Sequence, residues 1–291
     1  MPEEKPEEKK EEKKKTMDTK KPETRNLILY FVIAFAFSWL FWIPLALAEN
    51  GVPLPEGLVT FLKSPFSLGA WGPFVAAFLL TGINEKWAGV KFLLKRGVDL
   101  RFKKIWLLAI FFLPILIYSG GILLSVATGK TALDTAVLTN PPILIIGFLM
   151  VLLTGGPLQE EFGWRGYALD RLQARHNALV SSIILGLLWW LWHLPLALIP
   201  GKFMVNGLPL FFVLAIVIVL MTVLFTWIYN NTGRSLLASL LFHTAMNWGI
   251  WAILPTMKVT GEMILYWSIG LVVAAAIVVA VFGAKRLSRA A

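Results

Sequence analysis

Eight apolar runs, separated by short polar or basic segments, dominate this 291-residue chain. A helix of about 20 apolar residues crosses the hydrocarbon layer of a bilayer, because all of its backbone polar groups bond within the helix. With 57% apolar and 15% charged residues, the chain is also too apolar for a soluble protein. We therefore expect an all-α, polytopic transmembrane helical bundle of about eight spans. The predicted spans are Leu27 to Ala48, Phe66 to Ile83, Ile105 to Thr128, Ile143 to about Leu158, Leu179 to Ile199, Leu208 to Tyr229, Leu236 to Leu254 and Met263 to Phe282.

The first 25 residues, beginning MPEEKPEEKKEEKKK, are rich in Glu and Lys and carry no apolar face. Such a composition is typical of a disordered tail. We expect residues 1–25 to be a disordered cytoplasmic tail and residues 26–291 to form a single membrane-embedded domain.

The basic residues predict the orientation of the bundle. The tail, the 84–104 and 159–178 loops, the turn at Arg234 and the C-terminal end carry 23 of the 27 Lys and Arg residues, and the opposite loops carry four. By the positive-inside rule both termini lie in the cytoplasm. The 84–104 loop also mixes apolar and basic residues at helical spacing, which indicates a segment along the cytoplasmic interface. Because the basic residues flank spans, the net charge of +10 indicates topology and no nucleic-acid partner.

Very few ionisable residues lie within or beside the predicted spans: Glu160, Glu161 and Arg165 after span four, His193 in span five and His243 in span seven. A charge at mid-membrane costs about 2.5 to 3.5 kcal/mol on insertion scales, so such residues usually serve a function. Packing of helices through polar side chains is the alternative. The absence of cysteine excludes disulfides, thiolate metal sites and a thiol nucleophile.

The spacing of these residues suggests how they pair. Glu161 and Arg165 are four apart and share a helix face, so they can form an ion pair. Glu160 points about 100° away and is left for another role, although a purely structural pair would also fit. His243 and Asn247 are likewise four apart and present an imidazole and an amide on one face.

Known designs of intramembrane protease can be compared with this set. The sequence has no HExxH, no Asp inside a predicted span and no GxSxG motif. Site-2 zinc, aspartyl and serine designs therefore lack their residues. A glutamate with two histidines and an amide remains.

This pattern resembles the CAAX protease and bacteriocin-processing family, which includes the type II CAAX prenyl endopeptidases. The matching motifs are EExxxR at residues 160–165, an aromatic-xxx-His at Trp189 and His193, and HxxxN at His243 and Asn247. The segment GAWGPFVAAFL of span two is similar as well. One departure is Trp189, where the family usually has Phe.

The resemblance implies a glutamate intramembrane protease without a cofactor. Glu160 would be the general base that activates water, and His193 would help to hold that water. His243 and Asn247 would stabilise the oxyanion of the tetrahedral intermediate, a contribution of about 2.7 to 4 kcal/mol for preorganised donors.

The resemblance also implies a supporting set, Glu161, Arg165 and Trp189, and a substrate class. In the CAAX members the substrate is a C-terminally prenylated protein that loses its last three residues. We expect a prenylated or otherwise membrane-associated protein substrate that enters from the lipid bilayer, at a site that opens toward the cytoplasm.

Three alternatives stay open. Two histidines and a glutamate also match a catalytic zinc shell. A proton-coupled transporter would use Glu and His as a relay, but it predicts inverted repeats, and no convincing repeat is present. A non-catalytic scaffold that only binds lipidated proteins is the third.

Overall fold

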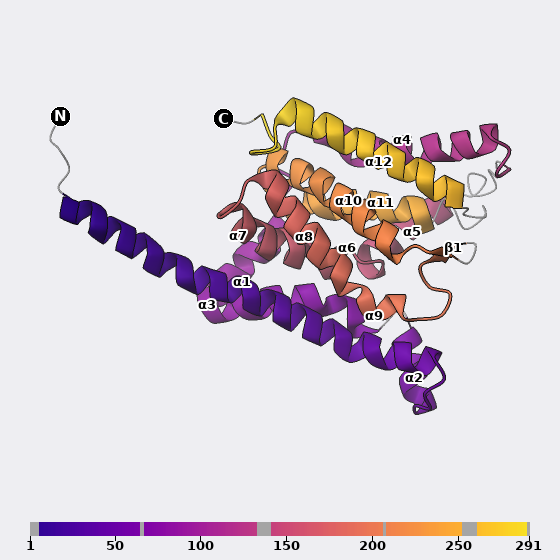
Figure 1. Cartoon of the computed structure of the whole chain (residues 1–291), viewed down its shortest axis with the longest axis horizontal. Coiled ribbons are helices and arrows are strands. Elements are labelled where there is room, and N and C mark those ends of the chain that lie inside the picture. The colour runs from indigo at the N-terminus through magenta and orange to yellow at the C-terminus, as the bar shows by residue number, and fades with distance from the viewer. Residues whose placement is uncertain (1–5, 65–66, 133–140, 206–207, 252–260, 290–291) are drawn as a thin grey trace.

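The computed structural model describes residues 6–64, 67–132, 141–205, 208–251 and 261–289. The predicted all-helical bundle is confirmed, with one minor addition: β1 and β2 form a short antiparallel hairpin (Figure 1). The elements are α1 (Pro6–Glu49), α2 (Glu56–Lys63), η1 (Leu68–Trp71), α3 (Gly72–Arg96), α4 (Trp106–Ala127), α5 (Pro141–Thr154), α6 (Pro157–Gly163), η3 (Trp164–Leu169), α7 (Asp170–Gln173), α8 (Ala178–Trp192), α9 (Leu194–Ala197), β1 (Met204–Val205), β2 (Leu208–Pro209), α10 (Phe211–Asn231), α11 (Leu236–Trp251) and α12 (Gly261–Phe282).

The described helices fall into three groups by length. Four are long and apolar enough to cross a membrane: Thr24–Glu49 of α1, α4, α10 and Met263–Phe282 of α12. Two bent pairs, α2 with η1–α3 and α5 with α6–α7, raise that number to six. The remaining two predicted spans correspond to shorter apolar helices, Ala178–Trp192 and Leu236–Ile250. Every predicted span thus overlaps an apolar helix, and the count of eight crossings stays a prediction.

The predicted end of the fourth span, at about Leu158, is wrong. After a 44° bend the chain continues as helix to Gln173. Gly156, with a φ of 109°, makes the bend, and Pro157 begins the new helix. The motif residues 160–165 are consequently buried inside the bundle, and Arg165 belongs to no loop. Without Arg165, 22 of the 23 basic residues remain in the group predicted to face the cytoplasm.

The predicted cytoplasmic loops meet at one end of the bundle, which we call the basic end (Figure 1). There Arg175 donates a hydrogen bond to Thr24, and Arg96 pairs with Asp170. The C-terminal segment joins them, because the carbonyl of Arg286 accepts a hydrogen bond from Asn230 of α10. Helices α2 and α9 and strand β1 lie at the opposite end.

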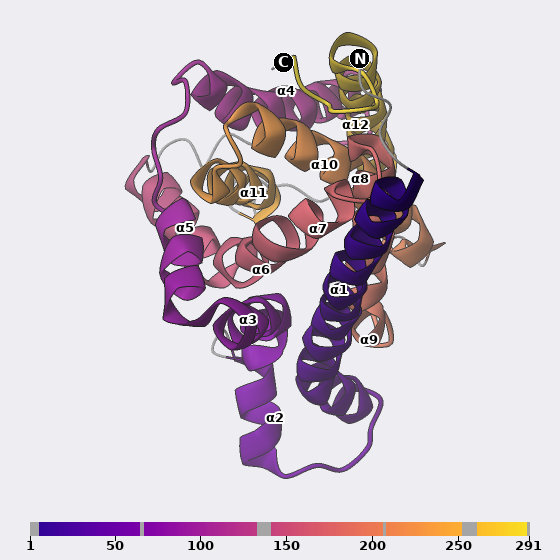
Figure 2. The same cartoon turned by 90° about the vertical axis from the view of Figure 1, so that its left-hand side faces the viewer.

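Helix α1 begins at Pro6 and so runs through most of the predicted tail, projecting away from the bundle (Figure 1). Its membrane-crossing part packs against α3, and α8 packs against α10. Figure 2 shows α6 and α7 enclosed between the α1–α3 side and the α4, α10, α11 and α12 side. The division into a tail and one membrane domain stays a prediction.

Candidate active site

The ion pair predicted from the i, i+4 spacing is present at the centre of the bundle. Arg165 Nη1 lies 2.7 Å from Glu161 Oε1, and both side chains are fully buried. The same oxygen lies 2.7 Å from His243 Nδ1 on α11. The Arg165 guanidinium also stacks over the rings of Trp189, at 4.7 Å, and Phe225, at 3.9 Å. Glu161 therefore links two helices and is the partner of His243.

Glu160 makes a separate set of contacts, as its position on the helix predicts. Its Oε2 accepts hydrogen bonds from two indoles, Trp189 Nε1 at 2.6 Å and Trp164 Nε1 at 3.1 Å. No hydrogen bond holds the other oxygen, Oε1, among the described residues. One oxygen thus fixes the carboxyl group in place, and the other is available to a reactant.

The backbone of η3, which follows the Glu pair, is a π-helix from Trp164 to Leu169. A π-helical turn holds one extra residue, and such turns occur frequently at functional sites. Gly163, the last residue of α6, directly precedes this segment, and a side chain there would collide with the carbonyl of Pro73 and the hydroxyl of Tyr30. The absence of a side chain at Gly163 allows α6 to approach α1 and α3 closely.

His193 ends α8 as its C-terminal cap and lies beside the same tryptophan. Its Nδ1 is 2.9 Å from the carbonyl oxygen of Trp189, which can only accept, so Nδ1 carries the proton. In the neutral ring Nε2 then has a free lone pair. Trp189 therefore connects the two groups: its indole holds Glu160 and its carbonyl orients His193.

Asn247 lies one helical turn after His243 and reaches toward the bend between α5 and α6. Its Nδ2 donates to the carbonyl of Gly155 at 2.9 Å, and the second N–H of the amide remains for another acceptor. A side chain at Gly156 would come within 2.6 Å of Glu160 Oε1 and 3.5 Å of Asn247 Nδ2. Glu160 and Asn247 therefore face each other across a glycine, which leaves space between a carboxylate oxygen and an amide donor.

His243 differs from Asn247 as a donor. Because Nδ1 faces the Glu161 carboxylate, Nε2 can donate to an oxyanion only when both ring nitrogens carry protons. The structure thus brings the predicted site residues into one connected cluster, whose catalytic roles stay predictions.

Three members of this cluster are not among the predicted site residues: Trp164, Phe225 and Gly156. Trp164 is four residues after Glu160, so the spacing rule that found the Glu161–Arg165 pair could have found it. Phe225 comes from α10 and carries no local signal. Gly156 could have been noticed as part of a Gly-Gly-Pro break inside an apolar run.

Within the described ranges, no three His, Cys, Asp or Glu side chains gather closely enough to hold a metal ion. His243 Nδ1 and Glu161 Oε1 instead bond to each other. A reaction without a metal therefore stays a prediction that needs a direct metal assay.

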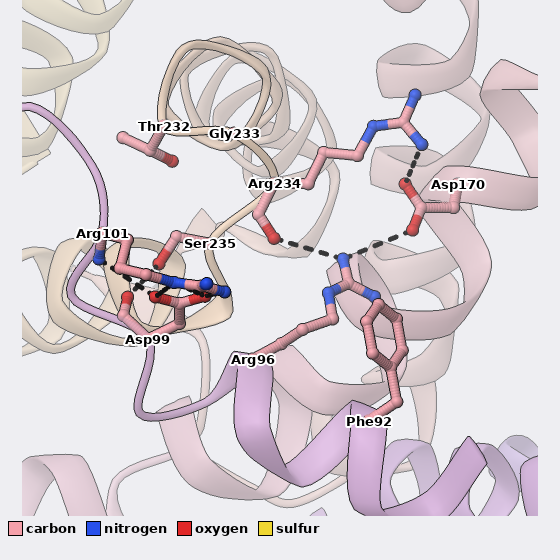
Figure 3. A pocket seen from close by; sticks show the side chains of 9 residues that line it. All are labelled: Phe92, Arg96, Asp99, Arg101, Asp170, Thr232, Gly233, Arg234 and Ser235. Carbon is pink, nitrogen blue, oxygen red and sulfur yellow. Dashed lines mark hydrogen bonds and ion pairs between the residues drawn. The ribbon is translucent and has the colours of Figure 1, made fainter. Parts of the chain in front are cut away.

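A second polar cluster lies at the basic end, around a cavity of about 470 Å³ (Figure 3). Arg96 contacts Asp170 at 3.3 Å and the hydroxyl of Tyr229, and Arg234 approaches Asp170 at 3.5 Å. Asp99 and Arg101 pair with each other at 2.6 Å. Because each charged group already has a partner, this cluster ties α3, α7, α10 and the turn before α11 together.

Two comparisons with known proteins bear on the motifs. A family model described as type II CAAX prenyl endopeptidase Rce1-like matches residues 141–249, the part of the chain that holds all three motifs. The chain is also 26% identical over 236 residues to CAAX prenyl protease 2 of Methanococcus maripaludis, which covers 76% of this chain and 83% of that relative. These matches confirm the resemblance to the type II CAAX prenyl endopeptidases that the motifs indicate.

Proposed function

We propose that the chain is an intramembrane endopeptidase that hydrolyses a peptide bond near the C-terminus of a prenylated protein. The observation that supports this most is the placement of Glu160. Its Oε2 is fixed by two indoles, and its Oε1 faces the spare donor of Asn247 across Gly156. We infer that the attacking water lies beside Glu160 Oε1 and the peptide carbonyl beside Asn247.

In the proposed reaction, Glu160 Oε1 accepts a proton from water, and the water oxygen bonds to the carbonyl carbon. His193 Nε2 accepts a hydrogen bond from the same water and orients it. The oxyanion that forms accepts a hydrogen bond from Asn247. It accepts a second one from His243 Nε2 when both ring nitrogens of His243 carry protons. Glu160 then transfers its proton to the amine of the leaving peptide as the C–N bond breaks. Every atom comes from substrate and water, so this scheme needs no covalent intermediate.

Site-directed variants test the roles of Glu160 and His193. Glu160→Gln and His193→Ala should abolish cleavage of a farnesylated peptide while the protein remains folded in detergent. Glu85→Gln is a matched control, since it removes a carboxylate whose ion pair with Arg171 lies outside the site. Substantial cleavage by purified Glu160→Gln would remove Glu160 as the base. A wild-type protein that binds the peptide without cutting it would favour the scaffold.

The zinc alternative is tested on the wild-type protein. Without a metal in the mechanism, chelators should leave cleavage unchanged. A stoichiometric metal whose removal and return switch activity off and on would support the zinc enzyme instead.

Entry of the lipid through the bilayer predicts a large effect of prenylation. A farnesylated peptide should be cut much faster than the same peptide without its lipid, because each buried CH₂ contributes about 0.8 kcal/mol to partitioning. A preference that persists at equal membrane-bound concentrations would show that the protein recognises the lipid itself. Equal rates at equal total concentration would argue against a prenylated substrate.

We also propose that both termini and the entrance to the site face the cytoplasm, on the basis of the charge asymmetry. The chain has no native cysteine, so a single cysteine can be placed at any position. A cysteine at Thr24 in sealed, oriented vesicles should react with an impermeant maleimide only from the cytoplasmic face. Reaction from the other face would reverse the proposed orientation.

A further inference from the structure

A cavity of about 580 Å³ opens at the end of the bundle opposite the basic end. It lies between α1, α2, η1, α9 and the end of α5. Its lining includes the buried Trp42 and Leu196, which with the neighbouring Thr154 we call its inner wall. The charged residues Glu49, Lys63 and Lys202 are at least partly exposed, and we call them its outer part. A cavity of this volume is large enough for a small ligand.

The inner wall of this cavity adjoins the candidate active site. Trp42 stacks on the imidazole of His193, with ring centroids 6.1 Å apart and planes 16° from parallel. The backbone N–H of Leu196 donates to the carbonyl of His193 at 2.9 Å. Thr154 directly precedes Gly155, the residue that holds Asn247. The inner wall of the cavity is therefore in contact with, or next in sequence to, residues of the candidate active site.

The outer part carries one more positive charge than negative charge. Lys63 Nζ lies 2.6 Å from Glu49 Oε1, so these two charges neutralise each other. Lys202 remains, and among the described residues it forms no ion pair within 4.0 Å. Surrounding protein lowers the pKa of Lys202, and the charge of Glu49 opposes that shift. A single ammonium at the mouth of an apolar cavity matches a ligand with a single negative charge.

We propose that this cavity receives the residues on the C-terminal side of the scissile bond and that Lys202 binds their terminal carboxylate. The inference rests on the proposed endopeptidase function. Three extended residues span about 10 Å, at roughly 3.3 Å each. Along the chain, Lys202 is next to Phe203, whose ring lies 6.5 Å from the ring of His193. The substrate would then enter from the basic end, which we propose to be cytoplasmic, with its lipidated part toward the bilayer and its C-terminus extending past His193 toward α2 and α9 at the opposite end.

The test compares two prenylated peptides that differ only at the C-terminus, one with a free carboxylate and one with a carboxamide. The wild-type protein should cut the free acid about 10- to 100-fold more efficiently in kcat/KM, mainly through KM, because charge-assisted hydrogen bonds are the strong ones. Lys202→Met keeps the apolar stem and removes the charge, so it should lose this preference. Lys202→Arg should retain most of it. Lys130→Ala, which removes a lysine that does not line the cavity, should behave as the wild type.

Several results would overturn the proposal. Equal cleavage of acid and amide by the wild-type protein would show that the carboxylate is not recognised, while the proposed hydrolysis would stand. An unchanged preference in Lys202→Met would mean that another group binds the carboxylate. Cleavage of neither peptide by folded wild-type protein would reject the endopeptidase function together with this inference.

Discussion

Two clusters of arginine and carboxylate, only a few residues apart along one helical segment, show how differently the same groups behave. In the inner cluster Glu161 and Arg165 are 0% exposed. At the basic end Asp170 is 24% exposed, and its partners Arg96 and Arg234 are 14% and 62% exposed. An exposed ion pair contributes at most about 1 kcal/mol, whereas loss of one partner of a buried pair leaves an uncompensated charge. Removal of one charged residue should therefore lower the free energy of unfolding much more in the inner cluster than at the basic end.

The largest expected effect is on stability, from removal of the inner carboxylate. Glu161→Ala should lower the free energy of unfolding by about 3 to 5 kcal/mol, because Arg165 stays charged and buried without its partner. Unfolding in denaturant, monitored by tryptophan fluorescence, measures the change. Asp170→Ala is the control at the basic end. Its pair with the exposed Arg234 contributes at most about 1 kcal/mol, and its pair with the partly buried Arg96 is still open to water, so the total loss should be smaller than for Glu161→Ala.

A double variant, Glu161→Met with Arg165→Met, sharpens this comparison. It removes both buried charges and should be considerably more stable than Glu161→Ala. If Glu161→Ala and Asp170→Ala destabilise equally, burial is not what distinguishes the two clusters.

The next effect concerns catalysis, and the loss of the hydrogen bond from Asn247 to the carbonyl of Gly155 should lower stability by only about 1 kcal/mol. Asn247→Ala removes the spare amide donor that faces Glu160 and should lower kcat by about 10² to 10³ with little change in substrate binding. Single-turnover cleavage of a farnesylated peptide measures this. An increase in KM alone would assign Asn247 to substrate binding.

The smallest effect is a dependence of stability on pH at the basic end. Hydrogen bonds and the charge of Arg101 hold the pKa of Asp99 at about 2, below its usual value of 3.8. The native state therefore favours the charged form, and this contribution is present above about pH 4 and lost as the pH falls toward 2. Asp99→Asn should be slightly less stable than the wild type at pH 6, and the difference should disappear near pH 2. A difference that is constant over this range would assign the effect to hydrogen bonding alone.

Most of the fold could be predicted from the sequence, because a bilayer permits only one pattern for a helical span. The apolar runs located the helices, and i, i+4 spacing found the Glu161–Arg165 pair. The end of the fourth span was wrong because hydropathy treats the charges at residues 160–165 as a loop, whereas here they are buried and pair within the bundle. A hydropathy window does not detect that compensation.

The site was only partly predictable for a different reason. The contact between His243 and Glu161 joins residues 82 apart, and the contact between Trp189 and Glu160 joins residues 29 apart. Contacts between residues so far apart in the sequence do not follow from i, i+4 spacing, so each depends on how the helices pack. The resemblance to a family selected the residues, and their pairing came only from the three-dimensional arrangement.

The π-helical turn at Trp164–Leu169 has a consequence for how this sequence can change in length. A residue deleted from an α-helix rotates everything beyond it by about 100°. Here one deletion would instead convert the turn, which holds one extra residue, to ordinary helix, so Glu160, Glu161 and Asp170 could all keep their places. This segment can therefore lose one residue where a regular α-helix could not. Among homologous chains, the number of residues between the glutamate pair and the aspartate should differ by one between chains with the π-helical turn and chains without it.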